Sequence, residues 1–380
     1  MKLSIVLGAF FPVPPTMGGA VEKVWFALAG QFAARGHEVV VISRQMPTLL
    51  REEVADGVKH IRVRGFDAPR SLLWLKVLDF LYSLNARSVL PEADIVVTNT
   101  FWLPILLRDQ SRGRIYVHVG RYPKGQMRFY KRAARLQAPS KAIADAIKRQ
   151  VPELAARVST IPYPAPEPEN PMPPTASSRP KMILFVGRVH PEKGVHLLVD
   201  AFVSGLRTLF ADWKLMIVGP VDTKLGGGGE EYLEQLKGAA STAGERIVFQ
   251  GPVFDRLSLE KIFRGARIFV YPSLAERGES FGLAPLEAMA HGCAVLVSNL
   301  DCFNDFITDG QTGFIFDHRA GDSTLYQKLA NMIADPDTLA RVADAGRSKS
   351  AEYSPDRVAE KFLADFESIV SEPYAERTNR

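Results

Sequence analysis

Short apolar runs alternate with amphipathic stretches along the first 160 residues. Leu3–Leu7 and Glu38–Ile42 are rich in β-branched residues and predict buried strands, whereas Val21–Ala34 repeats apolar residues at helical spacing. Further strands are expected at Ile61–Val63, Ile95–Val97, Ile115–Val117 and near Ala138. Alternation of strands and helices predicts a parallel, doubly wound α/β sheet.

The same pattern restarts near residue 181. It predicts strands at Met182–Val186, Leu215–Val218, Ile247–Phe249, Ile268–Val270, Ala294–Val297 and Phe314–Phe316. It predicts helices at Gly194–Phe210, Glu230–Ala240, Leu257–Arg264 and Leu286–His291. This is a second Rossmann-like domain, and two such domains predict a central ligand cleft that faces the carboxyl ends of both sets of strands.

A proline-rich stretch divides the two patterns. Residues 161–180 contain eight prolines, which predicts a semi-rigid linker at 166–180 between an N-terminal domain (1–165) and a C-terminal domain (181–354). The chain ends in an amphipathic segment, about 355–380, with Val358, Phe362, Phe366 and Val370 on one face. A helix there would pack on one of the two domains.

Composition describes a globular protein of two domains. The chain has 380 residues, of which 46% are hydrophobic and 23% charged, and no apolar run approaches the roughly 20 residues of a membrane span. The start reads as a first strand and not as a signal peptide. The chain has only two cysteines, Cys293 and Cys302, and their spacing is not that of metal ligands. We therefore expect no disulfide framework, and we expect a cytoplasmic location.

Charge separates the two halves. Residues 1–165 hold 24 basic and 12 acidic residues (+12), and the remainder holds 23 and 30 (−7). A basic half suits either a solvated helix face, an acidic acceptor or an anionic membrane surface, and no nucleic-acid partner is expected. Residues 70–90 form a strongly apolar helix beside this charge, which suits either packing on the sheet or contact with the inner face of a membrane.

The most specific motif lies at residues 276–290. A strand ending at Val270 is followed by a loop with Glu279, and a helix opens near Phe281-Gly282 and carries Glu287. Unpaired amides from Ser280 to Leu283 would attract a phosphate. The two carboxylates, seven residues apart, could then meet hydroxyls on either side of a diphosphate, or they could be acids on a solvated helix face.

A second motif places two basic side chains directly after a strand. Gly187-Arg188 follows Met182–Val186, and Lys193 comes five residues after Arg188. An arginine fork and a lysine point charge can bracket a diphosphate and stabilise it as a leaving group. Gly219 and Val253 follow the ends of later strands. The Gly226–Gly229 run predicts a mobile surface loop without a chemical role. Asp335-Pro336-Asp337 predicts a helix cap.

In the first domain the chemistry again follows strands. Gly18-Gly19 opens the helix after the first strand, where glycine allows close approach of a ligand to the backbone. His118 ends a strand, followed by Arg121 and Lys124, and a lone histidine at such a place is either structural or part of a site. The absence of G-x-G-x-x-G argues against a dinucleotide enzyme.

Nearly the whole chain resembles the retaining GT-B glycosyltransferases of family 4 (glycosyl transferases group 1), through Gly-Gly, Gly-Arg-x4-Lys-Gly and the E-x7-E segment. The resemblance implies a GT-B fold whose last helix crosses back to the first domain, and transfer of a sugar from a nucleotide diphosphate sugar, UDP by default. It implies that Arg188, Lys193 and the amides near Phe281-Gly282 hold the diphosphate and that Glu287 holds the ribose. The resemblance also implies catalytic roles for Glu279, His118, Arg188 and Lys193. It implies further contacts to the donor from Gly187, Gly219, Val253, Ser280, Phe281, Gly282 and Leu283.

The acceptor side is expected to include Gly18, Gly19, Arg121 and Lys124, facing an anionic or lipid-linked acceptor. No cofactor and no metal are expected, because positive side chains and helix ends do the metal's work in GT-B sites. Tyr163-Pro164 departs from the common Asn-Gly near the linker. A GT-B nucleotide-sugar epimerase and a non-catalytic nucleotide-sugar binding module remain alternatives.

Overall fold

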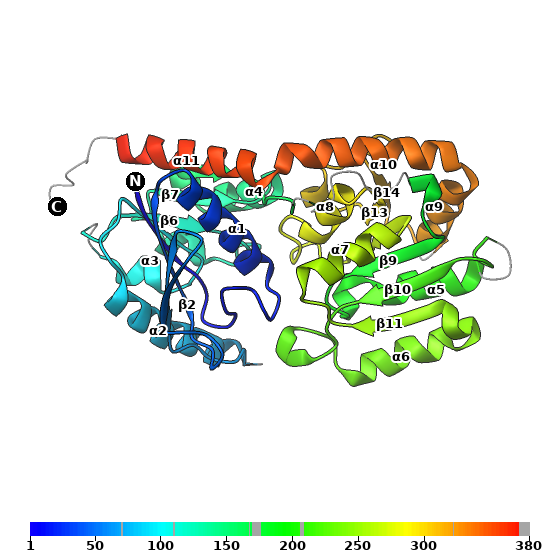
Figure 1. The fold of residues 1–380 in the computed structure, drawn as a ribbon, viewed down its shortest axis with the longest axis horizontal. Coiled ribbons are helices and arrows are strands. Elements are labelled where there is room, and N and C mark those ends of the chain that lie inside the picture. Colours follow the sequence, from blue (N-terminus) through cyan, green and yellow to red (C-terminus); the bar gives the residue numbers. More distant parts are fainter. Residues whose placement is uncertain are drawn as a thin grey trace. The chain divides into compact units, whose positions relative to one another are not determined.

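The chain folds into two compact α/β units. The computed structural model describes residues 1–69, 71–108, 111–166, 168, 176–205, 209–321 and 323–371. Unit 1 comprises residues 1–163 together with the segment from Pro355 onward, and unit 2 comprises Pro164–Ser354. In Figure 1 the blue-to-cyan part of unit 1 is joined by the red final helix.

Unit 1 is built on an eight-stranded sheet in the order β3-β4-β2-β1-β5-β6-β7-β8. Its strands are β1 (Lys2–Val6), β2 (Glu38–Arg44), β3 (Glu52–Ala55), β4 (Val58–Val63), β5 (Ile95–Thr98), β6 (Arg114–His118), β7 (Arg135–Ala138) and β8 (Val158–Thr160). All neighbouring pairs are parallel except β3 with β4. The predicted doubly wound sheet is confirmed, and its central strands are buried as the apolar runs require.

The antiparallel β3–β4 hairpin was not predicted. Asp56 and Gly57 connect the two strands with φ values of 50° and 76°. An Asp-Gly pair with two positive φ angles is the signature of a tight hairpin turn. The polar strand β3 concealed it, because three of its four residues are exposed and its apolar periodicity is weak.

The helices of unit 1 cover the sheet. They are α1 (Ala20–Ala34), α2 (Leu72–Val89), α3 (Leu103–Leu106), α4 (Lys141–Gln150) and α11 (Pro355–Ser371). The predicted return of the last helix is confirmed, because α11 packs on α1 in unit 1. Phe366 lies 4.9 Å from Tyr116 and 5.8 Å from Phe32, ring centre to ring centre, and Phe362 lies 5.1 Å from Trp25. Residues 372–380 of the predicted segment lie outside the described residues.

Unit 2 contains a six-stranded, wholly parallel sheet in the order β11-β10-β9-β12-β13-β14. Its strands are β9 (Met182–Val186), β10 (Lys214–Val218), β11 (Ile247–Gly251), β12 (Ile268–Tyr271), β13 (Ala294–Ser298) and β14 (Phe314–Phe316). Its helices are α5 (Val195–Gly205), α6 (Glu230–Ala240), α7 (Arg256–Gly265), α8 (Leu283–Ala290), α9 (Ser323–Ala334) and α10 (Pro336–Ser350). Counted within the unit, the strand order is 3-2-1-4-5-6, the dinucleotide-fold order.

The end of the predicted linker belongs to unit 2. Ala176–Ser178 forms a single 3-10 turn, and Arg179 is 2% exposed. Its guanidinium donates hydrogen bonds to the carbonyls of His291 (2.6 Å) and Ala266 (3.1 Å). Residues 167 and 169–175 of the linker lie outside the described residues. Within the described part of the chain, no helix is both long and apolar enough to cross a membrane.

Candidate functional site

The topological switch point of unit 2 collects the predicted donor residues. The sheet order reverses between β9 and β12, which are neighbours in the sheet. The loop after β9 carries Arg188 and Lys193, and the loop after β12 carries Glu279. The backbone N–H of Leu274 donates to the carbonyl of Glu192 (2.8 Å), which ties the two loops together. Ligands bind at such crevices at the carboxyl ends of parallel strands.

Arg188 is held by a neighbouring carboxylate and a backbone carbonyl. Its Nη2 donates to Oε1 of Glu192 (2.6 Å) and its Nη1 donates to the carbonyl of Gly226 (2.8 Å). Both side chains of the ion pair are about 40% exposed, at 40% and 39%. Exposed pairs of this kind are worth only about 0–1 kcal/mol. The guanidinium can therefore exchange Glu192 for an anionic ligand at small cost.

Lys193 forms a second, buried ion pair with Glu279. Its Nζ lies 2.5 Å from Oε2 of Glu279, and the side chains are 7% and 10% exposed. The carboxylate also accepts hydrogen bonds from the hydroxyls of Tyr271 (3.2 Å) and Ser273 (3.1 Å). Three donors thus fix Glu279, and the pair is preorganised beside the Arg188 loop.

The charge of Lys193 is secured by its surroundings. Burial alone would lower the pKa of Lys193, but interactions with Tyr271 and with Glu279 outweigh burial and raise it. Burial and the nearby Glu279 also raise the pKa of Tyr271, so Tyr271 remains a neutral phenol at neutral pH. Tyr271 and the Glu279 carboxylate together keep Lys193 cationic.

The N-terminus of α8 adds unpaired amides near Glu279. Gly282 is the N-cap residue with φ 96°, and no side chain caps the helix. Pro285 lies in the first turn and has no N–H, so the amides of Leu283 and Ala284 are the free donors of that turn.

Phe281 and Glu287 flank those amides in different ways. Phe281 is 1% exposed and packs on Phe306 and Tyr353, at 5.3 and 6.3 Å between ring centres. Its ring therefore belongs to the core, and only its backbone can meet a ligand. Glu287 lies in the second turn of α8 and is 7% exposed, as a residue inside a site would be and a solvated acid would not.

The loops after β10 and β11 complete the switch-point edge. Gly219 has φ 151°, and a Cβ there would lie 1.7 Å from the carbonyl oxygen of Gly187. Only glycine fits this close approach, which explains the predicted glycine at position 219. The N–H of Gly219 donates to the carbonyl of Gly251 (2.9 Å), and half-buried Val253 follows two residues later.

The glycine run Gly226–Gly229 was expected to be a mobile surface loop without chemistry, and the structure corrects this. The N–H of Gly228 donates to Val189 (2.8 Å), and the N–H groups of Gly227 and Gly229 donate to Asp222 and Val221 (both 2.9 Å). The run therefore packs beside the β9 loop and holds Arg188 through Gly226. Asp335 is confirmed as the cap of α10, accepting from the N–H of Thr338 (3.0 Å).

In unit 1, two arginines hold the loop between β1 and α1. Arg44 donates to the carbonyl of Phe10 (2.8 Å). The fully buried Arg62 donates to the carbonyl of Val13 (3.3 Å) and pairs with Glu53 (2.5 Å). The loop that ends at Gly18-Gly19 is thereby anchored through its backbone to the strands β2 and β4.

Glu22 lies against this loop and was missing from the predicted site. It is 5% exposed, and its Oε2 occupies the space where a Cβ of Gly19 would lie, 2.3 Å away. Burial raises the pKa of Glu22 to about 7, with its own backbone N–H and the charge of Arg121 acting in the opposite direction. The adjacent sequence, Gly-Gly-Ala-Val-Glu, offered a signal, because an acid in a helix's first turn faces the preceding loop.

His118 is buried with both ring nitrogens engaged. Gln137 donates its amide to the carbonyl of Ile161 (2.6 Å), which turns its Oε1 toward Nδ1 of His118 (2.5 Å). Nδ1 therefore carries the proton, and Nε2 accepts from the hydroxyl of Tyr163 (3.0 Å). Burial lowers the pKa of His118 to about 4, with the Gln137 hydrogen bond opposing the shift. The ring is neutral, and contact with a sugar requires Tyr163 to move.

Arg121 and Lys124 are exposed in the loop after β6. Arg121 lies near enough to Glu22 to influence its pKa. The backbone N–H of Lys124 donates to Oε1 of Gln126 (2.6 Å), which shapes the turn. Among the residues that the structure describes, no three His, Cys, Asp or Glu side chains are grouped as metal ligands would be.

Comparison with protein families follows the division into two units. Residues 17–165 match the family described as Glycosyltransferase Family 4. Residues 167–349 match the family described as Glycosyl transferases group 1. The chain belongs to the group 1 glycosyltransferases. The switch-point residues Arg188, Lys193, Glu279 and Glu287 all fall within the second match.

Curated relatives support the same family. The chain is 33% identical over 193 residues to a phosphatidyl-myo-inositol mannosyltransferase of Mycobacterium leprae, across 50% of this chain and 47% of the relative. It is 29% identical over 181 residues to a lipopolysaccharide 1,2-N-acetylglucosaminetransferase of Salmonella typhimurium, across 48% and 46%. The similarity thus spans about half the length of each.

Solved structures establish the fold. The sucrose-phosphate synthase from Thermosynechococcus elongatus matches with TM-score 0.80 at 18% identity, across 97% of this chain and 99% of that one. Anabaena HepE in complex with UDP and glucose matches with TM-score 0.71 at 16% identity, across 97% and 100%. The expected GT-B fold of this group 1 glycosyltransferase is confirmed.

Proposed function

We propose that this chain is a retaining glycosyltransferase that moves a sugar from a nucleotide diphosphate sugar to an acceptor hydroxyl. The observation that carries the proposal is the group at the β9–β12 switch point: Arg188 and the preorganised Lys193–Glu279 pair. Family membership and the solved relative bound to UDP and glucose add support. UDP sugars are the first donors to test.

The cations act on the leaving group. Without a ligand, Arg188 and Lys193 are balanced by Glu192 and Glu279, so the cluster has no net charge (2 − 2 = 0). A diphosphate can displace the exposed Glu192 from Arg188, while the backbone N–H groups of Leu283 and Ala284 donate hydrogen bonds to a phosphate oxygen. As the bond from the anomeric carbon to phosphate breaks, these groups stabilise the charge that develops. We therefore propose that the chain needs neither cofactor nor metal.

The carboxylates position the donor. Glu287 would accept hydrogen bonds from ribose hydroxyls, and Glu279 would hold the sugar while its other contacts keep it fixed. The acceptor oxygen would attack from the face that the leaving phosphate vacates. A new bond forms from acceptor oxygen to the anomeric carbon, and the acceptor proton passes to the phosphate oxygen. This order keeps the anomeric configuration.

Unit 1 would supply the acceptor side. The Gly18-Gly19 loop, Glu22, Arg121 and Lys124 would frame the hydroxyl-bearing molecule. Two exposed cations favour an acceptor with a negative group, glycan or lipid-linked. His118 would act as a neutral, positioned hydrogen-bonding group and not as a nucleophile.

Product stereochemistry tests the proposal. The enzyme is incubated with UDP-α-sugars and then GDP-α-sugars, with phospholipid and glycan acceptors, in the presence of chelator, and the anomeric proton of the product is followed by NMR. An α-linked product supports the proposal, and a β-linked product overturns retention. Donor alone serves as a control, because an epimerised donor would identify an epimerase.

Glu279→Gln keeps the size of the side chain and removes its charge. The proposal predicts a loss of transfer of about 10²–10³-fold, the range seen when one group that stabilises the transition state is removed. Unchanged turnover in Glu279→Gln would remove Glu279 from the mechanism.

A further inference from the structure

Helix α2 of unit 1 turns an apolar face outward. Its large apolar side chains are exposed by 39% at Val77 and Leu84 and by up to 78% at Leu72. The residues that α2 buries include the polar Asp79 and Ser83, with Tyr82 and Ala86. The exposed set is Leu72, Leu73, Trp74, Val77, Leu81 and Leu84. Tyr82 and Ala86 pack on the core, as one of the two sequence-based alternatives requires, and α2 also presents a second apolar face that is exposed.

The exposed face is held rigidly. The carboxylate of Asp79 accepts the N–H groups of Phe101 (3.0 Å) and Trp102 (3.1 Å). The indole N–H of Trp102 donates to the carbonyl of Lys76 (2.8 Å). These bonds lock α2 to the segment after β5, so the outward apolar face is a fixed part of the unit.

Aromatic rings extend the apolar face onto two further segments. Phe80 contacts Trp102 with 5.4 Å between ring centres, and Phe101 contacts both Trp102 (5.0 Å) and Phe129 (6.2 Å). Phe129 is itself 50% exposed. The surface formed by the exposed face of α2, Phe101, Trp102 and Phe129 is called here the α2 face.

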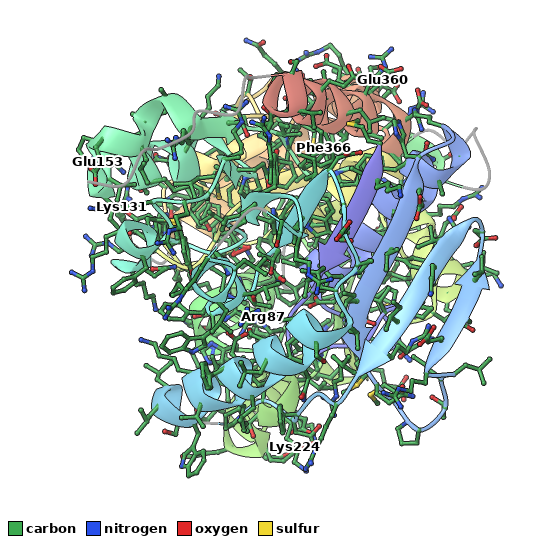
Figure 2. The ribbon with its side chains drawn as sticks, turned by 90° about the vertical axis from the view of Figure 1, so that its left-hand side faces the viewer. Arg87, Lys131, Glu153, Lys224, Glu360 and Phe366 are labelled. Carbon is green, nitrogen blue, oxygen red and sulfur yellow. The ribbon has the colours of Figure 1, made fainter. Side chains whose placement is uncertain are left out.

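Cations border the α2 face. Lys76 lies 5.0 Å from the ring centre of Phe101, and Arg128 lies 5.0 Å from that of Phe129. Residues 111–144 contain nine Lys and Arg and no Asp or Glu. Figure 2 shows Arg87 of α2 and Lys131 on the side of unit 1 that is turned toward the viewer.

A groove with the same charge adjoins the C-terminal half of α2. It has a volume of about 700 Å³ and is lined by Arg51, Arg64, Asn85 and Ser88, among others. Asn85 and Ser88 follow Leu81 at intervals of four and seven residues, so the groove lies on the same side of the helix as the apolar face, about one to two turns further along. A molecule with an apolar part and an anionic head matches both features.

From this geometry we propose that the α2 face docks on an anionic lipid bilayer surface, with the α2 side chains in the acyl boundary and the flanking cations on the headgroups. Large apolar side chains, aromatic rings at their border and flanking cations are the features that such a surface selects. The inference rests on unit 1 alone and holds whether or not the proposed donor chemistry is correct. It would bring unit 1 to lipid-linked acceptors.

Vesicle co-sedimentation of the full-length protein tests the proposal. Vesicles of phosphatidylcholine alone are compared with vesicles that also contain phosphatidylglycerol. We expect binding to the anionic vesicles and a marked loss of binding as salt concentration rises. No binding to anionic vesicles would overturn the proposal. Concentration-dependent self-association that Leu73→Ser/Leu81→Ser abolishes would also overturn it, in favour of a second copy.

Paired variants separate the two contributions. Leu73→Ser/Leu81→Ser should weaken partitioning by about tenfold or more, because two large apolar side chains are removed. Arg128→Gln/Lys131→Gln should weaken it by about 25-fold, at roughly fivefold for each charge. Val54→Ser/Leu257→Ser and Lys224→Gln/Lys361→Gln alter exposed residues of the same types outside the α2 face and should change nothing. Equal losses in the control pairs would contradict the proposal.

Tryptophan fluorescence provides an independent readout of insertion. Trp25 and Trp213 are buried, whereas Trp74 is 60% exposed. Anionic vesicles should shift the emission of the wild-type protein to shorter wavelength. Trp74→Phe should sediment with anionic vesicles like the wild-type protein and lose part of that shift, because the half-buried Trp102 of the α2 face remains as a second reporter. Donor binding, measured separately by calorimetry, should be the same in every α2 variant, so failure here is distinguishable from failure of the proposed function.

Discussion

At the scale of single residues, the two ion pairs at the switch point differ in burial, and we expect them to respond differently to a ligand. Arg188 and Glu192 are each about 40% exposed, whereas Lys193 and Glu279 are at most 10% exposed. An exposed pair exchanges partners at a cost of about 1 kcal/mol or less, but separating a buried pair costs about 3–5 kcal/mol. We therefore expect Arg188 to swing to the ligand and Lys193 to stay in place.

Glu192→Gln tests this exchange. Burial alone would raise the pKa of Glu192, but the charge and hydrogen bond of Arg188 lower it, so Glu192 is ionised at neutral pH and competes with a diphosphate. Its neutral variant should bind nucleotide diphosphates about two- to fivefold more tightly, since the competing pair is worth up to about 1 kcal/mol. Calorimetry measures the change, with Glu234→Gln as the exposed control, and tenfold weaker binding in Glu192→Gln would refute the exchange.

Glu22 predicts a pH dependence of unit 1 stability. Its pKa is raised to about 7 in the folded state from 4.5, chiefly by burial. Between about pH 4.5 and 7 the folded state therefore binds more protons than the unfolded state. The contribution of Glu22 to the free energy of unfolding is greatest below pH 4.5 and falls as the pH rises through 7. Glu22→Gln should be more stable than wild type at about pH 8, by up to about 3 kcal/mol, and similar near pH 4.5.

Denaturant titrations of both proteins across this pH range measure the difference. A constant gap between the two curves would show that the carboxyl of Glu22 is not the group that titrates. Burial lowers the pKa of His60, so the stability that depends on His60 rises with pH, opposite to that of Glu22. His60→Gln therefore serves as a second comparison.

At the scale of elements, the candidate site residues follow the carboxyl ends of strands, and closely packed backbone positions fix their orientation. The sequence predicted the strands before Arg188, Glu279 and His118 correctly, because β-branched runs bounded by glycine and proline are unambiguous. It missed the β3–β4 hairpin, whose polar strand has weak periodicity, and the packing of Gly226–Gly229. It could not reveal that His118 faces Gln137 and Tyr163, since that depends on contacts between distant segments.

Gly282→Ala tests the helix end that we assign to phosphate. A Cβ at Gly282 would lie 2.4 Å from the ring of Phe303, and φ is 96°. We expect loss of about 1–3 kcal/mol of unit 2 stability together with weaker nucleotide binding. Gly238→Ala, in open space on α6, should instead add about 0.5–1 kcal/mol and leave binding unchanged. Equal effects of the two substitutions would contradict the role of the α8 N-terminus.

At the scale of the whole molecule, the two units are separate cores that share one chain. The C-terminal helix α11 belongs to unit 1, where Phe366 packs on Phe32 and Tyr116. Figure 2 marks Phe366 on this helix. The apolar stripe of α11 predicted that this helix packs on an apolar surface. The family resemblance predicted that the surface belongs to the first domain.

Phe366→Ala should therefore destabilise one unit only. Removing a fully buried phenylalanine costs about 3–5 kcal/mol. Scanning calorimetry should show a lower transition temperature for unit 1 and an unchanged transition for unit 2, which a nucleotide ligand identifies by raising it. A shift of both transitions by the same amount would contradict independent cores.

The most direct test of the central claim is calorimetric titration of UDP-glucose, then other nucleotide sugars, into the full-length protein with excess chelator. The account predicts saturable binding that Arg188→Ala weakens by about tenfold or more, the loss expected for one charge-assisted hydrogen-bonded contact. Absence of binding by every nucleotide diphosphate sugar, or equal binding by wild type and Arg188→Ala, would contradict it.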